Sequence, residues 1–117
     1  GMIVAGISLS LKALAEHTAL LPRVESGPPR TLIGRNTKES ILSGMFNGYA
    51  ALIEGVVKKI KKELKGSAAS GARPVVVLTG GYGSFMGKFL KPAIDKADPD
   101  LIFKGLLLAL RSRHFES

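Results

Sequence analysis

Apolar residues recur at helical spacing in three parts of the chain, and these patterns predict most of its regular structure. The first begins at Ile7 and predicts a helix of roughly three turns that ends before Pro22. The residues 2–5 ahead of it are typical of the end of a strand, and the proline- and glycine-rich residues 22–34 after it predict a long surface loop. The apolar face of this helix comprises Ile7, Leu11, Leu14 and Ala15.

The second pattern predicts a long helix from near Thr37 to Leu64. Asn36 is a good N-cap residue, Glu39 follows at the spacing of a capping box, and Gly66 is placed as a C-terminal stop. We expect one apolar face of this helix to pack into the core. That face comprises Ile41, Met45, Tyr49, Leu52, Val56 and Ile60.

A stripe of small residues runs along the same helix. Each interior glycine costs a helix about 1 kcal/mol relative to alanine, and small residues let another backbone approach closely. We interpret the stripe as a surface for helix packing or for a dimer interface, with a ligand groove as the alternative. Its members are Ser40, Gly44, Gly48, Ala51 and Gly55.

Shorter elements are expected in the second half, after a flexible connector of small residues at 65–74. Four consecutive apolar residues at 75–78 predict a short buried strand, and residues 85–90 predict a short helix before Pro92. Asp98 is placed as the N-cap of a last helix, with Pro99 at its first position. Because this third helical pattern is apolar nearly all round, we expect most of the last helix to be buried.

Composition narrows the class of protein. The 117 residues are enough for a single domain over 1–117, and 45% of them are apolar, which favours a globular fold over disorder. The absence of cysteine excludes thiol catalysis, a cysteine-based zinc site and disulfides. We find no signal segment and no apolar run near the roughly 20 residues of a membrane span. A soluble, cytoplasmic protein that does not contact a membrane is therefore expected.

The formal net charge of +8 is concentrated in the segment 58–65. We interpret the lysines of this segment as the solvated face of the long helix, with an anionic partner as the alternative. Aromatic residues, which stack on bases, make up only 6% of the chain, so no nucleic-acid partner is expected. The lysines are Lys58, Lys59, Lys61, Lys62 and Lys65.

The glycines after the predicted strand have two possible roles. A strand that ends in Thr79, Gly80 and Gly81 and leads into a helix brings bare backbone close to a ligand, as in nucleotide sites. The same residues also suit a tight strand-to-helix turn. The spacing of Gly81, Gly83 and Gly87 is one residue too long for a Rossmann fingerprint, and no lysine followed by serine or threonine completes a P-loop.

Five segments in order resemble the C-terminal lobe of one enzyme family, type III pantothenate kinase, also called the Bvg accessory factor family. They are "GMIVAG", "LKALAEHTALLP", "IGRNTKESILSG", "LTGGYG" and "DPDLIFKGL". The resemblance implies an α/β fold, the C-terminal lobe of an actin-like, ribonuclease-H-like kinase, helix-rich with a small sheet. It also implies a homodimer that phosphorylates pantothenate with ATP as the first step toward coenzyme A.

The resemblance assigns roles to a few residues. Thr37 matches the family threonine that contacts pantothenate, although it also suits a second capping residue. Gly80 and Gly81 match the glycine pair beside the adenosine of ATP. The segment 1–6 matches a glycine-rich segment of the family, with Ala5 where proline is usual.

The resemblance also implies that the chemistry lies elsewhere. The N-terminal lobe of the family carries the catalytic aspartate, the phosphate-binding motifs and the ligands for a monovalent cation and a divalent metal. We expect no catalytic or metal-binding residue in this chain, and we expect the chain alone to be inactive. Its partners would be pantothenate, ATP, the N-terminal lobe and a second copy. The alternative is a noncatalytic homologue that acts as an interaction or regulatory module.

Overall fold

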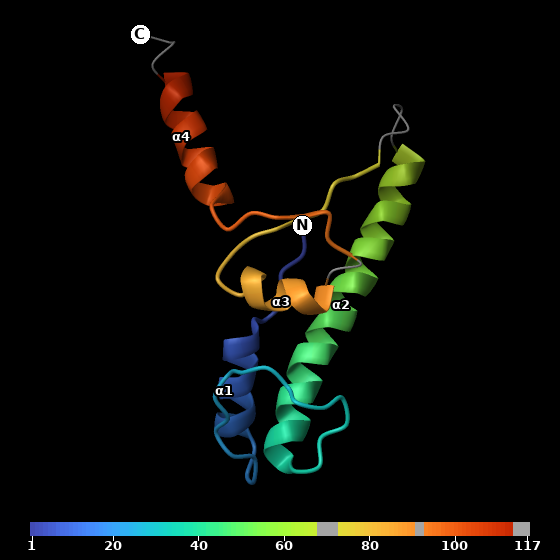
Figure 1. Cartoon of the computed structure of the whole chain (residues 1–117), viewed down its shortest axis with the longest axis vertical. Helices are drawn as coiled ribbons and strands as arrows, with labels where there is room; N and C mark the ends of the chain where they lie inside the picture. The colour runs from blue at the N-terminus through green and yellow to red at the C-terminus, as the bar shows by residue number, and fades with distance from the viewer. Residues whose placement is uncertain (68–72, 91–92, 114–117) are drawn as a thin grey trace. The chain divides into compact units, whose positions relative to one another are not determined.

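The computed structural model describes residues 1–67, 73–90 and 93–113, and it is an α/β chain rich in helix (Figure 1). The connector at 68–72, Pro92 and His114 lie outside the described residues. The chain divides into two compact units, residues 1–53 and 54–117, with the division inside the long helix. In order, the elements are α1 (Ile7–His17), α2 (Thr37–Ser67), β1 (Val77–Leu78), α3 (Gly83–Leu90), β2 (Lys96–Ala97) and α4 (Leu101–Arg113).

The first helix, α1, confirms the expected three turns, and Ile7 and Leu11 on its apolar face are buried. The long loop follows as expected, and within it Val24 is buried. The strand end expected before α1 is wrong, because residues 2–5 form no strand and their side chains are exposed.

The helix α2 begins where the sequence predicts. The Asn36 Oδ1 atom accepts a hydrogen bond from the Glu39 N–H at 2.9 Å, as an N-cap does. Glu39 Oε2 accepts from the N–H of Arg35 at 3.0 Å, one residue earlier than a standard capping box. The other end was misplaced, since α2 continues to Ser67 and includes Gly66.

The buried face of α2 differs from the expected one. Leu42, Phe46 and Ala50 are buried, and Phe46 is fully enclosed. Of the expected face, Leu52 and Ile60 are exposed. The cause of the error is that apolar residues occupy two adjacent sides of the helix, and the sequence pattern alone does not choose between them.

The stripe of small residues on α2 is open in the structure. A Cβ atom added at Gly44, Gly48 or Gly55 would meet no atom within 4 Å. The expected close approach of another backbone therefore does not occur within the described residues. Packing against a second copy stays a prediction.

By length and composition alone, residues 37–65 of α2 form a helix long and apolar enough to cross a membrane, which differs from the expectation of no such run. The core helix of a soluble protein and a signal sequence pass the same test, so one such helix is weak evidence for a membrane span.

A small parallel sheet organises the second unit. The strand β1 pairs with β2 in the register Val77 with Lys96 and Leu78 with Ala97, and α3 lies in the connection between them. The short helix was predicted, but β2 was not. The predicted strand is also shorter than expected and is not buried, since Val77 is 40% exposed and Val75 is outside the strand. Met86 and Leu90 of α3 are buried and form the apolar core of this unit.

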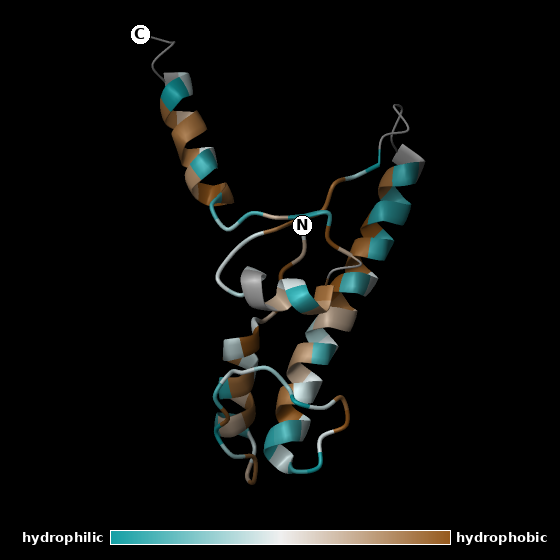
Figure 2. Cartoon of the chain, viewed as in Figure 1, coloured by the Kyte–Doolittle hydropathy of each residue, from teal (hydrophilic) through white to brown (hydrophobic). Residues whose placement is uncertain are grey.

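The prediction that the last helix is buried is wrong. Every residue of α4 from 101 to 112 is exposed, and Figure 2 shows apolar residues recurring along it. An apolar helix is buried only where another part of the protein covers it, and the sequence pattern does not show whether such a surface is present. Among the described residues of the second unit, none covers this helix. Its exposed large apolar residues are Leu101, Ile102, Phe103, Leu106, Leu107, Leu108 and Leu110.

Replacement of the enclosed aromatic ring tests the observed face of α2. Phe46→Ala should lower the free energy of unfolding by about 3 to 5 kcal/mol, because it removes a fully buried side chain and leaves a cavity. Leu52→Ala should cost only about 1 kcal/mol, since that side chain is partly in solvent. Urea denaturation followed by circular dichroism measures both. A larger loss for Leu52→Ala than for Phe46→Ala would contradict this face.

Candidate functional site

The backbone ahead of Thr37 is pressed against the first turn of α2. A Cβ atom added at Gly34 would lie 2.3 Å from the backbone nitrogen of Ser40 and 2.6 Å from the carbonyl carbon of Glu39. Because these are backbone atoms, no side chain can move aside to make room, so only glycine fits. The hydrogen bonds at Arg35 and Asn36 then fix the next two residues. Thr37 follows as the first residue of α2, and it is exposed.

The N-terminal end of α2 has the features of an anion-binding position. The Asn36 side chain accepts a hydrogen bond from the Glu39 N–H, and the Asn36 carbonyl oxygen accepts one from the Ser40 N–H. Among the described residues, this leaves the amides of Thr37 and Lys38 at the helix end. Such amides, together with the helix dipole, favour a negative group.

A cleft of about 590 Å³ lies beside this helix end. The cationic side chains of Arg30 and Lys38 line it, and so do the carboxylates of Glu25 and Glu39. Its walls come from the proline-rich loop and from the first turns of α2. The cleft is therefore polar and carries balanced charge, with Glu39 held by its bond to the Arg35 amide.

The glycines of the second unit form the turn between β1 and α3. Gly80 has a φ of +97°, a backbone conformation that residues other than glycine rarely adopt. Its carbonyl oxygen accepts a hydrogen bond from the Gly83 N–H at 2.9 Å. A Cβ atom at Gly81 would meet nothing within 4 Å. The Thr79 Oγ1 atom is buried and has no hydrogen-bond partner among the described residues. The turn therefore explains Gly80 structurally and leaves open space in front of Gly81.

The glycine-rich segment 1–6 is tied to α2 by a tyrosine. The Tyr49 hydroxyl donates a hydrogen bond to the carbonyl of Ala5, and Ser10 Oγ lies 2.9 Å from the Tyr49 Oη atom. Tyr49 was expected as an apolar core residue, but its hydroxyl makes hydrogen bonds to the Ala5 carbonyl and to Ser10 Oγ. The bonds fix the backbone where the segment enters α1.

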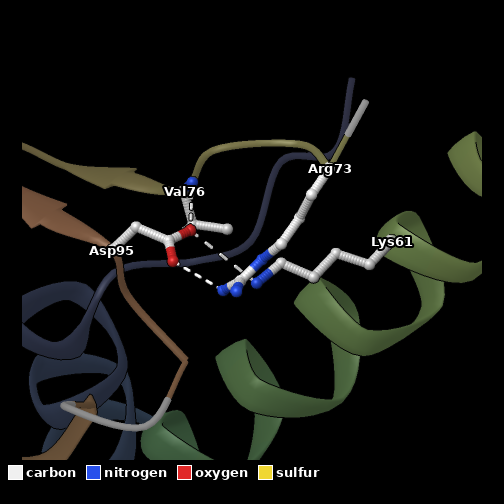
Figure 3. A network of polar contacts seen from close by, with 4 residues as sticks. All are labelled: Lys61, Arg73, Val76 and Asp95. Atoms are coloured by element: carbon white, nitrogen blue, oxygen red, sulfur yellow. Dashed lines mark hydrogen bonds and ion pairs between the residues drawn. The ribbon is translucent and has the colours of Figure 1, made fainter. Parts of the chain in front are cut away.

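Asp95 joins three parts of the second unit (Figure 3). Its carboxylate accepts from the Val76 N–H at 2.8 Å and from Arg73 Nη2 at 2.7 Å, and Lys61 Nζ lies 3.8 Å away. The Val76 amide, with help from the two cations, holds the pKa of this carboxyl below its ordinary value. Asp95 therefore anchors the residues that enter β1 to α2, and the turn at Gly80 follows at the other end of that strand.

A second carboxylate fixes the start of α4. Asp98 accepts from the Asp100 N–H at 3.1 Å, but α4 begins at Leu101, so the prediction of Asp98 as N-cap and Pro99 as the first helical residue is two residues too early. Lys104 Nζ lies 2.7 Å from Asp98 Oδ2. This ion pair lowers the pKa of the Asp98 carboxyl and raises that of the Lys104 ammonium. Asp98 is thus a structural group, as is Asp95.

Four of the lysines expected on a solvated face line a groove of about 490 Å³ along α2. Lys58, Lys62 and Lys65 are exposed, whereas Lys61 is half-buried and paired with Asp95. Val57 and Ala93 contribute apolar surface to the groove. The lysine face is therefore solvated for the most part, with one lysine used inside the second unit.

The predicted site residues lie in different units, with Thr37 in the first and Gly80 and Gly81 in the second. Gly34 and Asp95 were missed as determinants of these positions. A glycine directly before a capping sequence was the available signal for Gly34, while nothing in the sequence pairs Asp95 with Val76. Among the described residues, no three His, Cys, Asp or Glu side chains gather as metal ligands.

The family model and the relatives that match this chain all belong to one family. The family model described as type III pantothenate kinase matches residues 1–59. The type III pantothenate kinase of Thermus thermophilus is 40% identical over 107 residues, which cover 92% of this chain and 39% of the relative. That of Paramagnetospirillum magneticum is 45% identical over 92% of this chain and 38% of the relative. That of Rhodospirillum rubrum is 42% identical over 95% of this chain and 40% of the relative.

The anchor at Asp95 predicts a pH dependence of stability. Because the folded-state pKa lies below the ordinary value of 3.8, the ionised carboxylate stabilises the fold above that pH. This stabilisation should be lost as the pH falls through the lowered pKa. Asp95→Asn should thus lower the melting temperature at about pH 7 and have a progressively smaller effect toward about pH 2. A melting-temperature difference that stays constant over this range would contradict the role of the charge.

Proposed function

Because this chain belongs to the type III pantothenate kinase family, we propose that it is part of an ATP-dependent pantothenate kinase that catalyses the first step of coenzyme A synthesis. The observation that carries the proposal is the family match over residues 1–59, which includes the exposed helix start at Thr37. The chain spans about 39% of the length of the relatives it matches. We therefore assign it a share of the binding surfaces and assign phosphoryl transfer to no residue in it.

In this proposal, Thr37 and the N-terminus of α2 bind pantothenate. The substrate has a carboxylate, which suits the exposed amides at the helix end. The Thr37 hydroxyl lies at the same helix end and would donate a hydrogen bond to the bound substrate. The cleft beside it, with Arg30 and Lys38, gives the substrate a polar surface to lie against.

Gly80 and Gly81 form one wall of the adenosine pocket in the same proposal. The positive φ of Gly80 makes the turn, and the open space at Gly81 lets a ring edge approach bare backbone. The unpartnered Thr79 hydroxyl is available to a polar atom of the nucleotide. ATP is a substrate here, and the monovalent cation and the divalent metal would be held by parts of the enzyme other than the residues described.

The proposal includes the actin-like fold for the complete enzyme, a cytoplasmic location and a homodimer. The open stripe at Gly44, Gly48 and Gly55 supports the dimer, because these glycines cost helix stability and meet no atom of their own chain. In a dimer, this stripe would let two α2 backbones approach closely. Thr37, near one end of the stripe, would then contribute to the site of the neighbouring subunit.

The substrate contact is tested in the full-length protein. Thr37→Ala should raise the pantothenate KM about tenfold, since it removes a hydrogen bond to a charged ligand, and should leave the KM for ATP nearly unchanged. Thr37→Ser is the matched control, because it retains the hydroxyl and should behave like the wild type. Steady-state phosphorylation kinetics with each substrate varied give these values. A pantothenate KM unaffected by Thr37→Ala would remove the assignment, and no phosphorylation by the wild type would favour a noncatalytic homologue.

The nucleotide contact is tested by filling the open space at Gly81. A Cβ atom at Gly81 meets no atom within 4 Å, so we expect the melting temperature of Gly81→Val to change little. The added side chain should nevertheless block the approach of adenosine and raise the ATP KM about tenfold or more, with the pantothenate KM unchanged. Gly105→Val, on the exposed α4, is the control for the substitution itself. An ATP KM that stays at the wild-type value would contradict the assignment of this turn to the nucleotide.

A further inference from the structure

The last part of the loop before Thr37, residues 31–36, is held without apolar burial. Leu32 and Ile33 are 72% and 82% exposed, so their side chains do not anchor it. Within the loop, Thr31 Oγ1 donates to the Ile33 carbonyl at 3.0 Å, which shapes the turn but does not attach it to a helix. The attachment must therefore come from polar contacts and from the fit of Gly34 against α2.

One polar contact comes from the buried side of α2. Ser43 is 5% exposed, and its hydroxyl donates a hydrogen bond to the carbonyl of Leu32. The same Oγ atom accepts from Asn47 Nδ2 at 3.0 Å, and Asn47 Nδ2 also lies 3.1 Å from the Ser43 carbonyl. Because Asn47 occupies the acceptor side of the hydroxyl, the proton of Ser43 is directed to Leu32.

The two attachments lie on either side of Ile33. Ser43 holds the carbonyl of Leu32, and the first turn of α2 holds Gly34, Arg35 and Asn36. The backbone between them has little freedom, and Thr37 follows directly. Loss of the Ser43 bond would release the start of this short segment while leaving the cap of α2 in place.

We propose that Ser43 and Asn47 are positioning residues, which hold the segment 32–36 so that Thr37 and the amides beside it are preorganised for the substrate. This inference rests on the proposed function, because it takes Thr37 as a pantothenate contact. Neither side chain touches the substrate in this account. Their effect on affinity arises because a loop fixed before binding loses less conformational freedom on binding.

The experiment uses the full-length protein and a pair of serine variants on the same helix. Ser43→Ala should raise the pantothenate KM about threefold to tenfold, the effect of one net hydrogen bond, with kcat and the ATP KM within about twofold of wild type. Ser40→Ala is the matched control, because Ser40 is exposed and the same change in helix propensity occurs. Ser43→Thr, which keeps the hydroxyl, should restore much of the affinity. Asn47→Ala, which leaves the Ser43 hydroxyl in place, should have a smaller effect in the same direction.

Two further readouts separate positioning from a merely structural role. In hydrogen exchange, Ser43→Ala should raise the exchange of the amides at 32–37 and leave the amides of α1 unchanged. In the double variant with Thr37→Ala, the Ser43→Ala change should add little further loss, since both act on one contact.

The outcomes distinguish this inference from the proposed function. Faster exchange at 32–37 with an unchanged pantothenate KM would overturn the positioning role while leaving the Thr37 assignment to its own test. Unchanged exchange would overturn the proposed attachment itself. Additive effects of Ser43→Ala and Thr37→Ala would show that Ser43 does not act through Thr37. If Ser43→Ala does not fold, the same measurements on Asn47→Ala decide the question.

Discussion

The hydrogen bonds that fold the residues 32–36 back onto the first turns of α2 are the constraint on which the first unit depends. They fix where α2 begins, and with it the angular position of Leu42, Phe46 and Ala50 on the helix. A shift of one residue in that start would rotate each side chain by about 100° and carry the ring of Phe46 out of the core. The polar cap therefore sets the helix start, and the helix start determines which apolar side chains face the core.

The second unit depends on a similar arrangement with a different group. Asp95 connects the Val76 amide to cations from α2 and from residue 73, so the strand β1 is fixed at the end where it begins. The sheet adds only a two-residue pairing between β1 and β2. Such a small sheet contributes few ladder hydrogen bonds, and the carboxylate at its margin supplies the attachment that a longer strand would obtain from a neighbouring strand.

The helices and caps that depend on neighbouring residues were predictable from the sequence. The features that depend on contacts between distant residues were not. The cap at Asn36, the three turns of α1 and the helix after the glycines follow from residues within one turn of each other. The buried side of α2 does not, because Ile41 and Met45 are as apolar as Leu42 and Phe46, and only contacts with distant residues distinguish the two sides. The strand β2 was missed for the same reason, since two residues carry no periodicity.

The candidate site divides in the same way. Resemblance to a family located Thr37 and the pair Gly80 and Gly81, because these belong to short continuous motifs. The supports of these residues escaped prediction. Ser43 reaches the Leu32 carbonyl across 11 positions and Asp95 reaches Val76 across 19, so no local pattern reveals either contact. Motifs therefore identify candidate ligand contacts, while the structure is needed to find what holds the motif in place.

The structure distinguishes glycines that the fold of the chain requires from glycines that it does not require. Gly34 is required by the backbone of Ser40 and Gly80 by its positive φ, so the fold itself accounts for both. Gly44, Gly48 and Gly55 have neither reason, since a Cβ atom at each would enter open space and alanine would favour the helix by about 1 kcal/mol at each position. We propose that a contact with a second copy of the chain offsets a cost of that size, repeated along one side of α2. Under that proposal, the glycines at 44, 48 and 55 serve packing between two copies and not the fold of one chain.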